Sequence, residues 1–213
     1  MKLHAYWRSS ASYRIRIALN LKGLDYEIIP VNLFEGEHRG ADFAKINAFK
    51  SLPVLEYAGR QHVQSVAILD LLEQRFPEPS LFPKHPDERN RALEMAMPIA
   101  TDLQPVNNLR IMNYLKDQFD VASKDVITWY QHWIHETYAP LETMLGQIDL
   151  KRGWAFGAPG IFEIMLVPQT YNALRFKTNM SQYPTLLNYY EHCLEDEAFQ
   201  KASPEAQPDA TDT

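Results

Sequence analysis

The segment at residues 6–19 reads YWRSSASYRIRIAL and decides how the first part of the chain folds. Serine is favoured where a helix begins, and glycine where it ends. Residues 13–17 alternate between polar and apolar side chains as a strand does, so the interior of the segment is ambiguous. The apolar run that follows, up to Leu21, breaks the alternation and favours a helix. We therefore expect a helix over Ser9–Gly23, preceded by a short strand over Leu3–Trp7.

Strand and helix signals continue to alternate over the first 80 residues. The expected elements are a strand at 26–33, a short helix or loop at 43–49, a hairpin at 52–63 with Gly59 in its turn, and a helix from Ser65 that stops before Pro77. Pro53 cannot donate to a strand ladder, so it belongs at a sheet edge, at a strand start or in a cis turn. This order of elements predicts a small α/β sandwich.

The character of the chain changes after a proline-rich stretch at residues 77–86. From there helical periodicity dominates, and the expected helices lie at 89–115, 126–145, 161–176 and 183–202. The last residues carry no large apolar side chain and cannot offset their ordering entropy. The predicted organisation is an α/β domain at 1–80, a linker at 81–88, an all-helical domain at 89–202 and a loose tail at 203–213.

The composition excludes several functional classes. The 213 residues are 46% hydrophobic and 23% charged with a net charge of -6, which allows a large core and argues against a nucleic-acid binder. Neither common nucleotide-binding fingerprint occurs. The single cysteine, Cys193, excludes an intrachain disulfide or a multi-cysteine metal site and is expected to be a buried structural thiol. The polar N-terminus and the lack of a long apolar run predict a cytoplasmic protein without a membrane span.

Two serine-containing helix starts have two interpretations each. Residues 9–12 (SSAS) and 64–65 (QS) can act simply as N-caps. Hydroxyls and exposed N–H groups at a helix start also favour bound anions, which suits a thiolate at residues 9–12 and a carboxylate at residues 64–65. The two interpretations are compatible. Because no cysteine lies near residues 9–12, a thiol held there would belong to a ligand.

Residues 6–19 are similar to the signature of the zeta-class glutathione transferases, and further matches follow in the same order. They are SLPVL at 51–55, QSVAI at 64–68, LQPVNNL at 103–109, LVPQ at 166–169, NALRF at 172–176 and QPD at 207–209. The resemblance spans essentially the whole chain. It implies a thioredoxin-like N-terminal domain, an all-α C-terminal domain, a cis peptide before Pro53 and a homodimer.

The resemblance also implies that the protein binds glutathione and indicates where. Ser9 is the expected activator of the thiol, with Ser10 as the alternative. Gln64 and Ser65 are expected at the γ-glutamyl end, and the backbone of Leu52 at the cysteinyl part. His38 is either a contact of the glycyl end or a solvated loop histidine. The other implied contacts are Ala11, Ser12, Gln104 and Asn108.

The activity that the resemblance implies is glutathione-dependent cis–trans isomerisation of a maleyl dicarboxylate, such as maleylacetoacetate or maleylpyruvate. A thiolate that adds reversibly to the conjugated double bond allows rotation about it. Arg8, Arg110 and Arg175 are expected to bind the carboxylates, since a guanidinium pairs with a carboxylate in a bidentate manner, although exposed arginines are common on any surface. Arg8 is also expected to act beside Ser9 on developing oxyanion charge. A transferase that consumes glutathione and a non-catalytic binding protein are the alternatives.

The chain departs from the family pattern in two places. Ala11 stands where many relatives carry cysteine, a change that we do not expect to disable the site. The stretch at 159–163 lacks the Ser or Thr of a capping box, and Glu163 is expected to reach back to the helix start, leaving a weaker helix start but an intact fold. His132 and His135 are interpreted as a surface or cleft pair, because no further ligands complete a metal spacing.

Overall fold

The computed structural model describes residues 1–211, except for the side chain of Arg152. The described chain divides into two units, one formed by residues 1–81 and 194–211 and the other by Phe82–Cys193. The first boundary falls at the start of the expected linker. The second differs from the expected organisation, because the segment from residue 194 onwards folds with the N-terminal unit and not with the helical one.

In residues 1–211 the strands form one four-stranded sheet with the order β2–β1–β3–β4. They are β1 (Lys2–Ala5), β2 (Glu27–Pro30), β3 (Val54–Tyr57) and β4 (Arg60–Val63). β1 is parallel to β2 and antiparallel to β3, and β3 and β4 form a hairpin. Its turn residues Ala58 and Gly59 have φ values of 51° and 74°, as the turn that best matches strand twist requires. The predicted α/β sandwich and its hairpin are confirmed.

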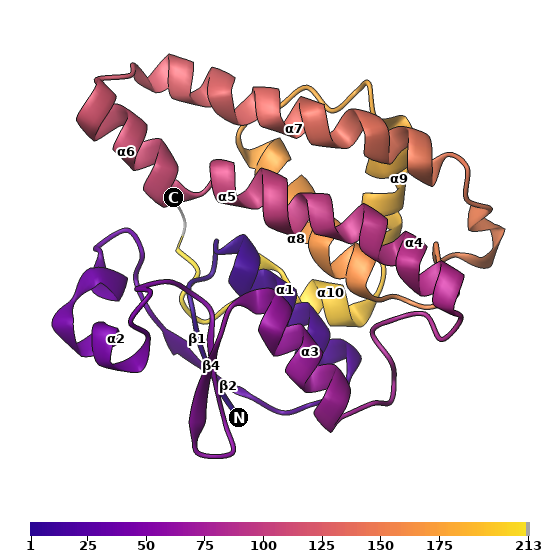
Figure 1. The fold of residues 1–213 in the computed structure, drawn as a ribbon, viewed down its shortest axis with the longest axis horizontal. Helices are drawn as coiled ribbons and strands as arrows, with labels where there is room; N and C mark the ends of the chain where they lie inside the picture. Colours follow the sequence, from indigo (N-terminus) through magenta and orange to yellow (C-terminus); the bar gives the residue numbers. More distant parts are fainter. Residues whose placement is uncertain (212–213) are drawn as a thin grey trace. The chain divides into compact units, whose positions relative to one another are not determined.

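Helices cover both faces of this sheet (Figure 1). α1 (Ser10–Leu21) packs against α3 (Ser65–Arg75) and α10 (Glu197–Ala202), and α2 (Ala41–Ile46) lies on the other side of the sheet. Alternation along β1 explains this arrangement. Leu3 and Ala5 are buried, while the ring of His4 lies 6.4 Å from that of Phe43 on α2. The expected helix after Ser9 is confirmed.

The C-terminal segment is folded, so the expectation of a loose tail was wrong over residues 203–211. η4 (Pro204–Ala206) is a 3-10 turn, and the Gln207 amide donates to two carbonyls at the end of α10, at 3.0 and 2.8 Å. The carboxylate of Asp209 accepts a hydrogen bond from the Trp7 N–H at 3.0 Å. The expectation counted apolar side chains only, whereas hydrogen bonds to backbone groups hold this segment. Residues 212 and 213 lie outside the described residues.

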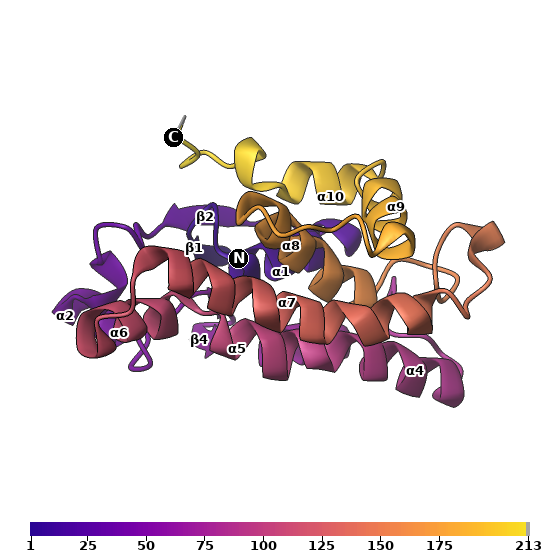
Figure 2. The ribbon, with the colours of Figure 1, turned by 90° about the horizontal axis from the view of Figure 1, so that it is seen from above.

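The second unit consists of helices packed around α8 (Ile161–Arg175). Residues 161–170 are all buried, and α4 (Pro86–Met97) and α9 (Pro184–Cys193) pack against α8. Figure 2 shows α7 (Ser123–Leu145) extending along this unit. The remaining helical segments are η2 (Pro98–Leu103), α5 (Gln104–Val106), α6 (Leu109–Phe119) and η3 (Leu150–Arg152).

Two of the expected helices are interrupted. The helix expected at 89–115 breaks before α6, where extended Asn108 caps α6 by accepting from the N–H of Arg110 at 3.1 Å. The helix expected at 183–202 breaks at Asp196, which caps α10 by accepting from the N–H of Ala198 at 2.8 Å. In both places a short polar side chain starts a new helix, a signal that periodicity does not detect.

Candidate functional site

A tight turn connects β1 to α1 and presents Ser9. The Ser9 N–H donates to the carbonyl of Tyr6 at 2.9 Å, which closes a turn over Tyr6–Ser9. Ser9 is the N-cap of α1, with extended backbone, and its Oγ accepts from the N–H of Ser12 at 3.2 Å. Because Oγ is the acceptor in that bond, the hydroxyl proton of Ser9 is directed elsewhere and can be donated to a ligand. Capping and thiol activation are therefore compatible at this residue.

The start of α1 carries positive partial charge. Its first turn contains no acidic side chain, so nothing in that described turn offsets the helix dipole. Ser10 and Ala11 are half-buried beside Ser9, whereas Ser12 is fully buried. The Ser12 hydroxyl is thus out of reach of a ligand, and its contribution is the N–H that orients Ser9. Hydroxyl donors at a helix start favour a thiolate over a thiol.

The start of α3 forms a second anion-binding feature of the same unit. Gln64 is exposed and has a φ of 68°, which a non-glycine residue seldom adopts. Ser65 is only 8% exposed at the first position of the helix, and within residues 1–211 no side chain caps α3. Its first N–H groups are therefore available to a carboxylate.

A buried arginine lies beneath this helix start. Arg14 is 1% exposed, and its Nη1 donates to Oγ of Ser65 in a long hydrogen bond of 3.4 Å. The guanidinium is always charged and adds a full positive charge to the α3 dipole. We did not single out Arg14 from the sequence. The available signal was its place between the large side chains of Tyr13 and Ile15 on the expected helix, because an arginine is rarely fully buried unless it is paired.

Leu52 and His38 both lie in the segment that connects β2 to β3. The Leu52–Pro53 peptide is cis, as the resemblance implied. Leu52 packs against the core cluster of Val31, Phe43 and Val54. His38 is half-buried in η1 (Glu37–Arg39), and within residues 1–211 its Nδ1 is buried without a hydrogen-bond partner. Burial, and then the charge of Arg39, lowers the pKa of His38, so the ring is neutral at neutral pH and can accept or donate one hydrogen bond.

Arg8 is the third residue of the Tyr6–Ser9 turn. It is half-buried, and its guanidinium carbon lies 4.0 Å from the centroid of the Trp7 ring. A cation over an indole face is held in place by the ring quadrupole. The position of Trp7 therefore also determines the position of the Arg8 guanidinium.

The second unit carries the other predicted contacts. Gln104 is half-buried on α5, Asn108 caps α6, and Arg110 is exposed in the first turn of α6. Arg175 ends α8, with its guanidinium carbon 4.5 Å from the centroid of the Phe176 ring, which in turn stacks on Tyr130. Burial raises the pKa of Tyr130, and the charge of Arg175 opposes that rise. The roles of these residues toward a ligand remain predictions.

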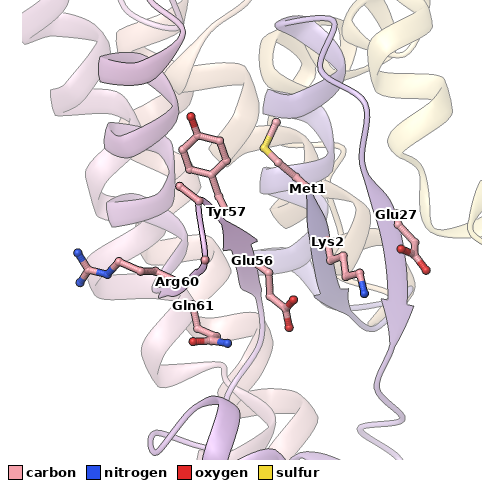
Figure 3. A pocket seen from close by; sticks show the side chains of 9 residues that line it. Met1, Lys2, Glu27, Glu56, Tyr57, Arg60 and Gln61 are labelled. Carbon is pink, nitrogen blue, oxygen red and sulfur yellow. The ribbon is translucent and has the colours of Figure 1, made fainter.

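An open concavity of the first unit lies away from this site (Figure 3). It is lined by residues at the start of β1 and by the β3–β4 hairpin, with Lys2 between Glu27 and Glu56 on the neighbouring strands. Since Ser9 follows the other end of β1, this concavity is not the predicted thiol site. Lys2 lies directly opposite Glu27 and Glu56 in the strand register, and opposite charges at such positions are an ordinary way to stabilise a sheet.

The remaining side chains that we singled out from the sequence have structural surroundings. Nδ1 of His135 lies 2.8 Å from the hydroxyl of Tyr183, and the exposed His132 packs against Trp133. Cys193 is buried, as expected. Across residues 1–211, no three His, Cys, Asp or Glu side chains are placed to hold a metal ion. Over the same residues, no helix has the length and apolar character needed to cross a membrane.

Comparison with known proteins identifies the class. Residues 1–74 match the family described as glutathione S-transferase, N-terminal domain. The chain is 38% identical over 212 residues to a maleylpyruvate isomerase of a Ralstonia species, covering 99% of this chain and 100% of that protein. It is 41% identical over 211 residues to a probable maleylacetoacetate isomerase of Vibrio cholerae, covering 98% and 97%.

Solved structures agree. The holo structure of a maleylpyruvate isomerase, a bacterial zeta-class glutathione S-transferase, superposes with a TM-score of 0.96 at 36% identity, covering 99% of this chain and 100% of that one. A maleylacetoacetate isomerase of Anaeromyxobacter dehalogenans, with dicarboxyethyl glutathione and citrate in its active site, gives 0.85 at 37% identity, covering 99% and 97%. The chain belongs to the zeta-class glutathione transferase family, which includes these isomerases.

Proposed function

We propose that this protein is a glutathione-dependent cis–trans isomerase of a maleyl dicarboxylate, such as maleylpyruvate or maleylacetoacetate. The observation that carries the proposal is the tight turn that places the hydroxyl of Ser9 at the positive end of α1, directly after Arg8 in the chain. The two relatives named above are isomerases of this class by their names. Each matches this chain over essentially its full length. The ligand named in the Anaeromyxobacter structure joins glutathione to a group with two carboxyls.

Glutathione fits the polar groups that the first unit leaves open. The uncapped N–H groups of α3, the Ser65 hydroxyl and the charge of Arg14 suit its γ-glutamyl carboxylate. The buried Nδ1 of His38 lacks a partner within residues 1–211 and suits its glycyl end. The backbone of Leu52 is proposed for the cysteinyl part and Gln64 for the γ-glutamyl end. Gln104 and Asn108 are the further contacts that the resemblance implies.

Each residue then has a defined task. Bound glutathione supplies the nucleophilic sulfur, which the protein itself lacks near Ser9. The Ser9 hydroxyl donates to that sulfur, with Ser10 as the alternative donor, and the α1 dipole favours the thiolate. Arg8, Arg110 and Arg175 bind the substrate carboxylates and stabilise negative charge that develops on the conjugated carbonyl. An acidic protein with three arginines proposed at its site suits a small dianion.

The test is an isomerase assay on purified protein with maleylpyruvate and maleylacetoacetate, each with and without glutathione. Product and free thiol are both measured. We expect turnover that requires glutathione and leaves its concentration unchanged, and the preferred substrate identifies the pathway. Loss of one thiol per turnover would instead establish a conjugating transferase, and absence of glutathione binding would leave a non-catalytic use of the fold.

We also propose that the protein is a cytoplasmic homodimer. Reduced glutathione is maintained in the cytosol, where a thiol-dependent isomerase can work. Large apolar side chains are exposed in both units, including Phe34 at 88% and Phe49 at 70% exposure, which suits a surface covered by a second copy. Light scattering on purified protein should give twice the chain mass of 24.7 kDa, and a mass of one chain would contradict the dimer.

A further inference from the structure

Both backbone polar groups of Trp7 are held by side chains that lie outside its turn. Oδ2 of Asp209 accepts from the Trp7 N–H at 3.0 Å, and Nη2 of Arg16 donates to the Trp7 carbonyl at 3.0 Å. Trp7 is the second residue of the Tyr6–Ser9 turn, whose closing hydrogen bond is 2.9 Å long. The orientation of Ser9 at the end of this turn therefore depends on two side chains outside the turn.

Arg16 joins this turn to the C-terminal segment. It is 0% exposed, and its Nε donates to the carbonyl of Ala202, the last residue of α10, at 2.8 Å. Its guanidinium carbon lies 5.2 Å from the centroid of the Tyr13 ring. A buried guanidinium with fixed partners has little freedom to shift. The end of α10 and the Trp7 carbonyl are therefore held at a constant separation.

The path from α10 to Asp209 is fixed as well. The Gln207 side chain is 8% exposed and donates to two carbonyls at the end of α10. The N–H of Ala210 donates to the carbonyl of Gln207 at 3.0 Å, which closes a turn around Asp209. These hydrogen bonds fix the backbone around Asp209 and so place its carboxylate at the Trp7 N–H. The other oxygen of Asp209, Oδ1, is buried without a hydrogen-bond partner within residues 1–211, so the group has been taken out of water to make this contact.

We propose that Asp209 is a positioning residue for catalysis. Through the Trp7 N–H it fixes the Tyr6–Ser9 turn, and so holds the Ser9 hydroxyl and the Arg8 guanidinium at the start of α1. This inference rests on the proposed function, because it assigns Asp209 a task toward the sulfur beside Ser9. A charge-assisted hydrogen bond to a backbone N–H is among the stronger contacts available for this purpose.

The test compares Asp209→Ala, Asp209→Asn and the matched control Asp25→Ala, an exposed aspartate of the same unit. The first readout needs no ligand: hydrogen exchange of residues 6–10 should be faster in Asp209→Ala and unchanged in the control. The second is the pKa of the bound glutathione thiol, followed by thiolate absorbance against pH. It should rise in Asp209→Ala and recover largely in Asp209→Asn, which retains an acceptor oxygen at the same place.

The kinetic expectation is a fall in kcat of about 10- to 100-fold in Asp209→Ala, the cost of a misplaced reacting group. KM for glutathione should change much less, because the α3 site is separate from the turn. Equal thiol pKa and equal kcat in Asp209→Ala and Asp25→Ala would overturn the proposal. So would a loss of activity in Asp209→Ala that matches its loss of folded protein, with an unaltered thiol pKa in the folded fraction.

Failure of the proposed function gives a different result. If the unaltered protein binds glutathione but isomerises neither substrate, the isomerase proposal fails, while exchange at residues 6–10 and the thiol pKa still decide the role of Asp209. If the unaltered protein binds no glutathione, both proposals are overturned.

Discussion

Ser9 shows how one hydroxyl serves a structural and a chemical task. As an acceptor it caps α1 through the N–H of Ser12, at 3.2 Å, which leaves its proton as a donor toward a ligand. Ser12, three residues on, is buried and serves only through its backbone. The same residue type therefore has different roles within one helical turn, and the difference is set by which side of α1 each side chain occupies.

Substitution of Ser9 separates the two tasks. We expect Ser9→Ala to reduce kcat/KM about 10- to 100-fold, since a hydrogen bond to a charged partner is worth about 1.5–3 kcal/mol, and to lower stability by about 1 kcal/mol through loss of the cap. Ser9→Gly should cost only a few tenths of a kcal/mol in stability, as glycine is tolerated at an N-cap, with the same loss of activity. Steady-state kinetics and urea unfolding measure both quantities.

Ser10→Ala is the matched control for this pair, because Ser10 is half-buried on the same helix and does not cap it. If Ser10→Ala loses activity and Ser9→Gly retains it, Ser10 is the activating residue. If Ser9→Gly is fully active and Ser9→Ala is not, the hydroxyl of Ser9 acts on stability alone.

At the scale of the element, the start of α8 shows how a family feature is kept in altered form. Gly160 supplies no cap hydroxyl, but Oε2 of Glu163 accepts from the Gly160 N–H at 2.8 Å, as the sequence predicted. Oε1 of the same carboxylate accepts from the hydroxyl of Tyr189 on α9. Glu163 therefore connects the start of α8 to a neighbouring helix, which a capping box confined to one helix does not do.

This burial makes the start of α8 sensitive to pH. Burial raises the pKa of Glu163 above its ordinary value of 4.5, and the hydrogen bonds from Tyr189 and Gly160 only partly oppose it. The folded state therefore holds this proton more tightly than the unfolded state. The stability that Glu163 contributes is complete below pH 4.5 and is lost as the pH rises through the raised pKa of the folded state. Relative to Glu163→Gln, which cannot titrate, the unaltered protein should lose stability as the pH rises.

The measurement is the free energy of unfolding in urea at a series of pH values from 4.5 upwards, for the unaltered protein and for Glu163→Gln. Glu191→Gln, at an exposed position on α9, is the control for replacing a glutamate by glutamine at the protein surface. A difference for Glu163→Gln that is constant, or that grows in favour of the unaltered protein at high pH, would contradict the assignment.

At the scale of the whole molecule, the sequence predicted what depends on local pattern. The β-hairpin around Gly59, the Ser9 cap and the buried Cys193 follow from turn chemistry, capping preference and periodicity, and all three are confirmed. The cis peptide before Pro53 followed from the resemblance and not from the residues alone. The roles of Arg110 and Arg175 toward a substrate stay predictions.

What the sequence did not predict depends on contacts between distant segments. Arg14 and Arg16 lie in a run that reads as strand or helix, and their burial depends on Ser65 and Ala202, which lie 51 and 186 residues further along. The segment 203–211 lacks large apolar side chains, yet Asp209 finds a partner 202 residues earlier, at Trp7. Such hydrogen bonds leave no periodic signal. The match of residues 207–209 to the family was the one sign that this segment has a defined place.

The first unit is built from two segments of the chain, and we predict that the first segment does not fold without the second. Residues 1–81 contain the whole sheet, but α1 is covered by α10, and Phe199 and Ala202 of that helix are 0% exposed. Without residues 194–211, α1 is no longer covered by Phe199, whose burial is worth about 1.5–3 kcal/mol of folding free energy. Arg16 also loses its hydrogen-bond partner, the carbonyl of Ala202. A chain of residues 1–81 alone should therefore be unfolded.

The matched variant joins residues 1–81 to residues 194–213 through a flexible Gly/Ser linker of about 20 residues, whose average span is about 25 Å. Far-ultraviolet circular dichroism and urea unfolding should show a cooperative transition for the joined chain and none for residues 1–81. Equal stability of the two chains would mean that residues 1–81 fold on their own and that the segment from residue 194 onwards adds no stability. The Arg16→Leu variant of the joined chain tests the buried guanidinium, because leucine is similar in volume but cannot donate to the carbonyls of Trp7 and Ala202. A lower stability of this variant would establish that the guanidinium connects residues 1–81 to the segment from residue 194 onwards.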